Sequence, residues 1–240
     1  MGGDQEKSVI EKFLDDNVLF LGPDPEIMKD HRVVETSPRE QAALDACNES
    51  FDMVEQMGAA PGAEWGDLIS GVWTMHGDLA MASMGGVLIF SVLTQHPVKF
   101  ILKYWKDDPT VGLKDGDVFM HNDARYGNIH NTDQSLVIPV FHEGELVCFT
   151  GAIVHEGENG ATEPGGMPSA AESPFDEGLK MSPILVGENY EFRRDIMTFL
   201  QNSVREPKLQ LEGMKSKLFA AMRMKARVDD AIAEYGVDAV

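Results

Sequence analysis

Positive charge is scarce in this chain. Its 240 residues include 20 Lys and Arg against 40 Asp and Glu, which gives a formal net charge of −20. Such a chain repels phosphate backbones and anionic lipid headgroups, so nucleic-acid and membrane partners are disfavoured. No run approaches the ~20 apolar residues of a membrane-spanning helix, and no basic segment followed by an apolar one opens the chain. These absences predict a cytoplasmic protein.

Thiols and nucleotide-binding motifs are equally sparse. The two cysteines, Cys47 and Cys148, lie far apart in apolar surroundings, which excludes a disulfide framework and a thiolate metal site. The chain has no Walker A sequence, no G-x-G-x-x-G after a predicted strand and no G-x-S-x-G. We therefore expect no serine nucleophile elbow, and we expect any ATP that the protein uses to bind elsewhere.

Helical segments are predicted towards both ends of the chain. Ser37-Pro38-Arg39-Glu40 is a capping box with proline at the first helical position, and apolar residues then recur at helical spacing until Gly58. The expected helices are Ser8–Asp15, residues 37–58, Val92–Trp105, Tyr190–Ser203 and a long helix after Pro207.

Strand signals fill the middle of the chain. The clearest is a hairpin that joins Leu136–Phe141 to Leu146–Val154 through a turn at residues 142–145. Pro139, inside the first of these strands, favours an edge position or a bulge. The other predicted strands are two that turn at His76-Gly77-Asp78 within residues 68–90, and a short one over Asp117–Met120.

This order of elements predicts an α+β fold. Strands are followed by helices without regular βαβ alternation. We expect a mixed or antiparallel sheet with the hairpin at its centre, flanked by helices and followed by a helical C-terminal segment. The expected regions are an N-terminal arm at 1–36, an α+β domain at 37–207 and a helical segment at 208–240.

Two stretches within these regions stand out by composition. Residues 156–180 form a long Gly/Pro-rich loop, and loops of this length in compact domains are usually functional or disordered. Residues 205–227 hold seven basic and two acidic residues. That local positive charge predicts either a solvated helix face or a surface that docks an acidic partner.

Histidines and carboxylates gather at the ends of the predicted hairpin strands. His130 and Asp133 precede the hairpin, and His155 follows it. Two histidines and one carboxylate are a common ligand set for a divalent transition metal with open positions. From Tyr126 to Leu179 the chain has nine carboxylates and no Lys or Arg, which favours a cation there. The alternative interpretation is that these are hydrogen-bonded structural residues.

The predicted strand register brings the three side chains together. If His142 pairs with Glu145 across the turn, the numbers of paired residues sum to 287. Asp133 then lies opposite Val154, next to His155, although a bulge at the proline of the first strand would shift this pairing by one residue. The predicted metal ligands are His130, Asp133 and His155.

A series of short motifs runs in order through about residues 67 to 207. They are Asn122-Asp123, Tyr126-Gly127, His130-x-x-Asp133, Pro139-Val140-Phe141, Gly144-Glu145-Leu146, His155, PGGMP at residues 164–168 and Glu177-Gly178-Leu179. Together they resemble the hydantoinase B/oxoprolinase family. Three sequence segments are most similar to the catalytic alpha subunits of acetone carboxylases and related ketone carboxylases. They are HNDARYGNIHNTDQ, IVHEGENGATEPGGMP and, later in the chain, NSVREPK.

The resemblance implies an activity and a set of partners. Such carboxylases use ATP to join a ketone and bicarbonate into a β-keto acid, which for acetone is acetoacetate. It implies manganese at the three predicted ligands, for which zinc or iron would also suit the donor atoms. It further implies a heterohexamer with a hydantoinase A-like beta subunit that handles ATP and a small gamma subunit.

The resemblance also suggests roles for three neighbouring residues. We expect Asp123 and Glu156 to orient the imidazoles or handle protons. We expect Arg125 to hold anions derived from bicarbonate.

The chain is shorter than the family's alpha subunits, which have several hundred residues. Its 240 residues cover what resembles the N-terminal third, so the domain at 37–207 is expected to be incomplete and the segment at 208–240 to lead into the remainder. Other functions stay open: carboxylation of an aromatic ketone such as acetophenone, or ATP-dependent hydrolysis of a hydantoin or 5-oxoproline ring. A metal-stabilised module that only scaffolds a complex is a further alternative.

Overall fold

Seven strands pair into one antiparallel sheet in the computed structural model, which describes residue 12, residues 37–58 and residues 61–237. The α+β class is thereby confirmed. The spatial order is β2-β1-β5-β4-β3-β6-β7. The strands are β1 (Leu68–Thr74), β2 (Leu79–Ala82), β3 (Val118–His121), β4 (Asp133–His142), β5 (Glu145–His155), β6 (Ile184–Glu188) and β7 (Glu191–Phe192).

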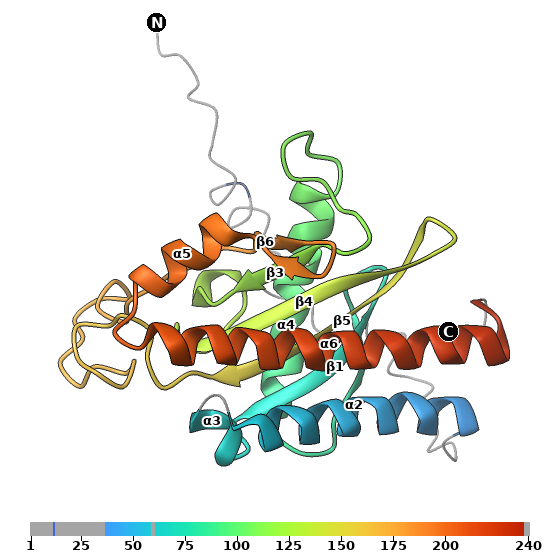
Figure 1. Ribbon diagram of the computed structural model, residues 1–240, viewed down its shortest axis with the longest axis horizontal. Helices are drawn as coiled ribbons and strands as arrows, with labels where there is room; N and C mark the ends of the chain where they lie inside the picture. The colour runs from blue at the N-terminus through green and yellow to red at the C-terminus, as the bar shows by residue number, and fades with distance from the viewer. Residues whose placement is uncertain (1–11, 13–36, 59–60, 238–240) are drawn as a thin grey trace, which may run out of the picture.

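Helices cover both faces of this sheet. In Figure 1, α6 runs across one face with α2 beside it, while α4 lies behind the sheet. The helices are α2 (Pro38–Met57), α3 (Pro61–Glu64), α4 (Leu88–Phe100), the π-helix η2 (Ile101–Trp105), the 3₁₀ helix η3 (Ala124–Tyr126), α5 (Arg194–Asn202) and α6 (Pro207–Tyr235). None of the described helices is both long enough and apolar enough to cross a membrane.

The β4–β5 hairpin lies at the centre of the sheet, as predicted. Glu143 and Gly144 form its two-residue turn with φ of 50° and 88°, the left-handed pair that suits the twist of a hairpin. The register shifts by one residue between Val140 and Phe141. Pro139 therefore lies beside a bulge, because β4 is an inner strand and offers no edge position.

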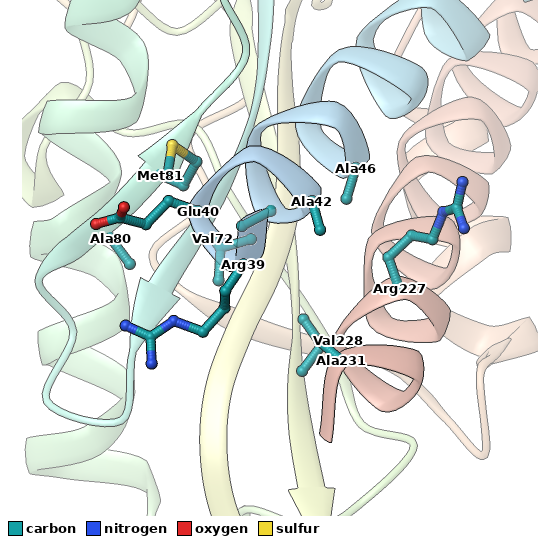
Figure 2. Close-up of a pocket in the computed structure, with 11 residues that line it drawn as sticks. Arg39, Glu40, Ala42, Ala46, Val72, Ala80, Met81, Arg227, Val228 and Ala231 are labelled. Carbon is teal, nitrogen blue, oxygen red and sulfur yellow. The ribbon is translucent and has the colours of Figure 1, made fainter. Parts of the chain in front are cut away.

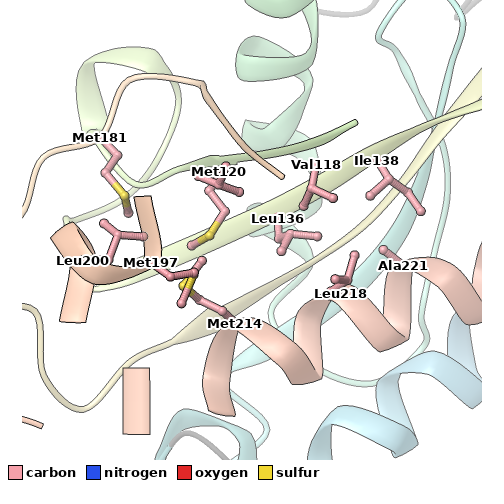
Figure 3. Packing of buried hydrophobic residues seen from close by; sticks show 11 residues of the cluster. Val118, Met120, Leu136, Ile138, Met181, Met197, Leu200, Met214, Leu218 and Ala221 are labelled. Atoms are coloured by element: carbon pink, nitrogen blue, oxygen red, sulfur yellow. The ribbon is translucent and has the colours of Figure 1, made fainter. Parts of the chain in front are cut away.

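Each face of the sheet carries its own apolar core. Side chains alternate along a strand, so Leu136 and Ile138 face α5 and α6, whereas Val137 faces α4. Figure 3 shows the first core, where strand residues meet Met197 and Leu200 of α5 and Met214 and Leu218 of α6. The second core contains Ile69, Trp73, Phe90, Val98, Phe119, Phe149 and Ile153.

The predicted helices and strands differ from the structure at several places. Residues 88–91 begin α4, although they were predicted to belong to a strand region, because the chain turns at Gly86 (φ 87°) and the helix starts four residues early. α4 also contains Pro97 and continues as a π-helix. Residues 184–188 and 191–192, which precede α5, form β6 and β7. Residues 61–64 form the short helix α3.

The N-terminal predictions cannot be compared with the fold. The arm at 1–36 and the helix Ser8–Asp15 lie outside the described residues, apart from residue 12. The capping box of α2 is present, with Glu40 N–H donating to Ser37 Oγ and Ser37 N–H donating to the Glu40 carboxylate. The boundary at residue 207 stays a prediction. α6 begins there and packs back across β4 and β5.

Most of the basic stretch at 205–227 is paired with carboxylates of this chain. Arg223 and Arg227 bind Glu49 of α2, and Arg205 binds Glu158 of the long loop. Lys217 binds Glu156, and Lys215 binds Glu212. Carboxylates of the same chain therefore balance most of the local charge. The Arg223 and Arg227 side chains remain 44% and 39% exposed, which fits the predicted solvated helix face, and docking of a partner stays a prediction.

Both cysteines are expected to resist alkylation in the folded protein. Cys47 of α2 is fully buried and Cys148 is 5% exposed, and burial raises the pKa of each thiol to about 12. Because the thiolate is the reactive form, iodoacetamide at pH 8 should leave the native chain unlabelled. Intact mass should show two adducts after unfolding in guanidinium, and rapid labelling of native protein would contradict this packing.

Glu158 is expected to stabilise the fold in a pH-dependent way. Burial alone raises the pKa of Glu158, but hydrogen bonds from the backbone N–H groups of Arg205 and Gly160 and from the Arg205 guanidinium outweigh it, so the pKa lies below its ordinary value. A depressed pKa means that the stabilisation is present above the ordinary carboxyl pKa and is lost as the pH falls through the folded value.

Replacing Glu158 with Gln should therefore lower the free energy of unfolding at pH 7 by about 1–2 kcal/mol. The difference from wild type should stay constant from pH 7 to about 4.5, the ordinary pKa of a glutamate, and shrink as the pH falls further, as measured by urea denaturation. Glu212→Gln is the matched control, because Glu212 is half exposed and such surface pairs contribute about 0–1 kcal/mol. A Glu158→Gln deficit that does not change with pH would contradict the prediction.

Candidate metal centre

The strand register places two of the predicted ligands directly opposite each other. Asp133 begins β4 and His155 ends β5, and the two residues form the last pair of the ladder. The prediction of Val154 opposite Asp133 was wrong by one residue, because the bulge between Val140 and Phe141 shifts the register. Paired residues project from the same face, so the correction brings both side chains to the α4 side of the sheet.

His130 completes the group from the loop that leads into β4. His155 Nδ1 lies 2.9 Å from Asp133 Oδ1, and His130 Nδ1 lies 3.5 Å from Asp133 Oδ2. The imidazole rings are 5.0 Å apart between centroids and nearly perpendicular. One nitrogen of each histidine and one carboxylate oxygen lie within 4.8 Å of one another, so the trio converges as predicted.

The group combines a buried charge with partly exposed imidazoles. The Asp133 side chain is fully buried, whereas the side chains of His130 and His155 are 24% and 19% exposed. The hydrogen bond to Asp133 raises the pKa of His155 above its ordinary value, although burial opposes this, and Asp67 adds to the rise. The carboxylate of Asp67 lies 3.7 Å from His155 Nδ1.

The loop between η3 and β4 is held by one asparagine side chain. The Asn128 amide donates hydrogen bonds to the carbonyl oxygens of Asn122, His130 and Asp133. Because these carbonyls belong to both ends of the turn, the amide fixes the position from which His130 reaches Asp133. Sequence analysis did not single out Asn128, although asparagine in a polar turn is a recognised signal of side-chain to backbone bonding.

The end of β5 requires a glycine in a neighbouring helix. A Cβ atom on Gly62 of α3 would lie 2.3 Å from the carbonyl oxygen of His155. The N–H of His155 donates to the carbonyl oxygen of Asp67, 3.0 Å away. The short helix α3 and the chain after it therefore pack against the backbone of His155.

Asp123 and Arg125 form an ion pair with each other. The guanidinium donates to both carboxylate oxygens, with Nη2 2.6 Å from Oδ2, and Asp123 also caps η3. Burial alone raises the pKa of Asp123, but the hydrogen bonds from Arg125 outweigh it and the pKa lies below its ordinary value. Asp123 is thus ionised, and the half-exposed Arg125 is already engaged by one carboxylate.

Glu156 lies on the other face of the sheet from the trio. Its carboxylate binds Lys217 of α6, and both side chains are almost completely buried. Glu158, the other acidic residue after β5, is bound to Arg205. Neither carboxylate is part of the converging group, because its charge is already paired with a cation of the C-terminal segment.

His121 is a buried neighbour of the trio. It lies opposite Ser135 in the β3–β4 ladder and hydrogen-bonds to the Ser135 hydroxyl. Burial lowers the pKa of His121 to about 4, so the imidazole is neutral at physiological pH. The structure assigns it to the hydrogen-bonded core beside the group.

The donor atoms of the trio suit a divalent cation. Asp133 Oδ2 is buried and has no hydrogen-bond partner among the described residues, although such atoms are rarely left unsatisfied. Two imidazole nitrogens and a carboxylate oxygen form a set that binds zinc, iron or manganese, with the remaining positions open to a substrate. The three side chains could therefore hold a divalent ion at this end of the hairpin.

One cavity in the described part of the chain is lined by α2, α6, β1 and β2 and lies away from the trio. Its volume is about 200 Å³, and Figure 2 shows residues that line it from α2, α6 and the β1–β2 pair. Ala42, Ala46, Val72 and Val228 line it, and its one carboxylate, Glu40, belongs to the capping box of α2. It contains no group of residues suited to catalysis, so we place the candidate site at the trio.

Comparison with known proteins gives a consistent picture. The chain is 35% identical over 202 residues to the acetophenone carboxylase delta subunit of Aromatoleum aromaticum, covering 83% of this chain and 29% of that protein. It is 26% identical over 189 residues to the acetone carboxylase alpha subunit of Xanthobacter autotrophicus, covering 78% of this chain and 24% of that protein. The chain thus spans less than a third of the length of these relatives.

A solved structure and a family model also match this chain. The nucleotide-free structure of acetone carboxylase superposes with a TM-score of 0.78 at 25% identity, over 83% of this chain and 26% of that one. The family model for hydantoinase B/oxoprolinase matches residues 62–240, which include all seven strands of the sheet and all three converging side chains. The chain therefore belongs to the hydantoinase B/oxoprolinase family.

Proposed function

We propose that this chain is the metal-binding part of the catalytic subunit of an ATP-dependent ketone carboxylase. In this proposal His130, Asp133 and His155 hold one divalent cation, with manganese as the first choice and zinc or iron as alternatives. The observation that carries it is the convergence of two imidazoles on one buried carboxylate, in a chain similar to acetophenone and acetone carboxylase subunits. Acetone, giving acetoacetate, and acetophenone are the ketones to test.

The proposed chemistry is the removal of an α-proton from a ketone followed by carbon–carbon bond formation. A divalent ion held there would supply Lewis-acid stabilisation of the oxyanion that develops on the ketone oxygen. Asp133 would contribute a ligand whose direction is set by the strand ladder, and the partly exposed imidazoles leave room for a substrate beside it. Bicarbonate supplies the carboxyl group and loses one oxygen, which leaves as phosphate at the expense of ATP, and water must be kept away from the enolate.

Arg125 and Asp123 have a proposed supporting role in this scheme. Arg125 is half exposed, so the N–H groups that do not contact Asp123 are available to an anion derived from bicarbonate. Asp123 would then orient the guanidinium. Glu156 faces α6, so we propose that it acts by holding the end of β5 in place and that it handles no proton of the substrate.

ATP and partner subunits are part of the proposal. The sequence contains no Walker A motif, so we propose that a hydantoinase A-like beta subunit handles ATP and that a small gamma subunit completes a heterohexamer. The names of the relatives support a multi-subunit enzyme, because both are called subunits.

A second candidate is an ATP-dependent amidohydrolase. The family description covers hydantoinases and oxoprolinases, and a metal that stabilises an enolate oxygen can equally polarise an amide carbonyl. In this case the substrate would be a cyclic amide, such as a hydantoin or 5-oxoproline, and the product would be the opened ring.

Replacing any one of the three ligands should remove the bound metal. We expect the wild-type chain to retain about one manganese per chain, and His130→Ala, Asp133→Ala and His155→Ala each to weaken manganese binding beyond the ~10–100-fold loss typical of a residue that only supports a ligand. Elemental analysis and titration with MnCl₂ measure this. His76→Ala is the matched control, because His76 is exposed in the β1–β2 turn. Metal retained in all three variants would contradict the assignment.

The substrate class should follow from product analysis of the assembled enzyme. With its partner subunits and ATP, we expect incorporation of labelled bicarbonate into a β-keto acid from acetone or acetophenone, and no opening of hydantoin or 5-oxoproline. Activity should fall with manganese content across the ligand variants. Ring opening without bicarbonate incorporation would favour the amidohydrolase. Full turnover by metal-free variants would show that the three residues have a structural role only.

A further inference from the structure

One face of α6 carries polar and small residues where the packing predicts apolar ones. Gln210, Gly213 and Lys217 are spaced by three and four residues, so they lie on one side of the helix. Gln210 is 3% exposed and Lys217 is completely buried. We call these three residues the α6 polar stripe.

The C-terminal end of the stripe holds Glu156. Lys217 Nζ binds the Glu156 carboxylate, and both side chains are buried on the α6 face of the sheet. A Cβ atom on Gly213 would lie 2.8 Å from both carboxylate oxygens, so the missing side chain is what makes room for them. Glu156 directly follows His155, and its backbone N–H donates to the carbonyl oxygen of Thr132, 2.9 Å away.

The N-terminal end of the stripe holds Gln134. Gln210 Nε2 donates to Gln134 Oε1 at 2.8 Å, and Gln134 Nε2 donates back to Gln210 Oε1 at 3.3 Å. Gln134 directly follows Asp133 in β4. The stripe therefore binds Gln134 and Glu156, the residues that directly follow Asp133 and His155. It does so on the face of the sheet opposite to the side chains of Asp133 and His155.

A stabilising role does not account for this arrangement. Replacing a buried ion pair with apolar residues of similar size is often neutral or stabilising, because the pair loses its hydration. A charged pair does impose a fixed depth and direction on its partners, which an apolar contact does not. Here that fixed point lies one residue from His155 and is tied through Thr132 to the segment between His130 and Asp133.

We infer that the α6 polar stripe is a positioning element of the metal centre. It holds the backbone at the ends of β4 and β5 so that Asp133 and His155 meet at the spacing that a cation requires. The inference rests on the proposed function for the role of the trio. Lys217, Gly213 and Gln210 are positioning residues, because they contact Glu156 and Gln134 rather than a substrate or a metal.

Two variants of the full 240-residue chain test this role. Glu156→Leu with Lys217→Met removes both charges while filling the same space, so the chain should keep a thermal midpoint close to that of wild type. Gly213→Ala suits a helix better than glycine but displaces the carboxylate. We expect both to weaken manganese binding by about 10–100-fold, the range seen when a residue supporting a ligand is lost.

The readout is the dissociation constant of Mn²⁺, taken from the electron paramagnetic resonance signal of the free ion, with circular dichroism as the measure of folding. Lys215→Met is the matched control, because Lys215 is partly exposed on the same helix and pairs with Glu212. It should bind manganese like wild type.

Manganese binding by the wild type tests the proposed function, and manganese binding by the variants tests the positioning role. Folded variants that bind manganese as tightly as wild type would overturn the positioning role and leave the proposed function intact. A wild-type chain that binds no manganese would overturn the proposed function, and the inference with it. Weaker binding in both variants at unchanged helix content supports the inference, because a stripe that only stabilised the fold would change the midpoint and not the affinity.

Discussion

The pairing of β4 with β5 is the constraint on which the rest of the structure depends. These strands form the centre of the sheet, and their ladder runs from the turn at Glu143-Gly144 to the pair Asp133–His155. Because side chains alternate, a slip of one residue would exchange the two cores and turn the histidine away from the aspartate. The bulge beside Pro139 is therefore more than a local irregularity, since it sets which residue lies opposite Asp133, seven positions from Val140.

Buried amides extend this constraint to the long loop after β5. The Asn122 side chain accepts a hydrogen bond from the N–H of Met181 and donates one to the carbonyl oxygen of Leu179. The Asn159 side chain donates hydrogen bonds to the carbonyl oxygens of Glu177 and Leu179. A loop without strands or helices leaves many backbone groups unpaired, and burying them costs free energy unless partners are found. The asparagine side chains provide those partners near the two ends of the loop, at Asn159 and at Glu177 and Leu179, while most of residues 162–175 are exposed.

Local signals made much of this fold predictable. The capping box at Ser37 and the turn at Glu143-Gly144 depend on neighbouring residues alone, and both elements are where the sequence predicts them. Convergence of the trio followed from strand pairing and the resemblance to a family. The exact pairing did not, because the bulge depends on packing. β6 and β7 were missed because both are short and β6 pairs with the distant β3. Residues 88–90 form an apolar run without a period that distinguishes helix from strand.

Tertiary contacts decided the remaining features of the site. Glu156 was predicted to orient the imidazoles or handle protons, and only the packing of α6 places it on the opposite face. The sequence did contain a signal for this, since Lys217 falls among the buried positions Met214, Leu218 and Ala221 of α6. A lysine within an apolar helix face indicates a buried partner, but the sequence alone does not identify which carboxylate that partner is.

The distance along the chain between paired elements also orders the assembly of this domain. The hairpin closes through a two-residue turn, whereas α6 meets α2 through Glu49 and Arg223, 174 residues apart. Short loops close at lower entropic cost and faster than long ones, so Asp133 and His155 are expected to come opposite each other early in folding. We expect α6, which contacts the residues next to them from the opposite face, to dock last. During synthesis on the ribosome, the hairpin is complete before α6 has been translated, so the nascent chain presents the three side chains before it can fix their spacing.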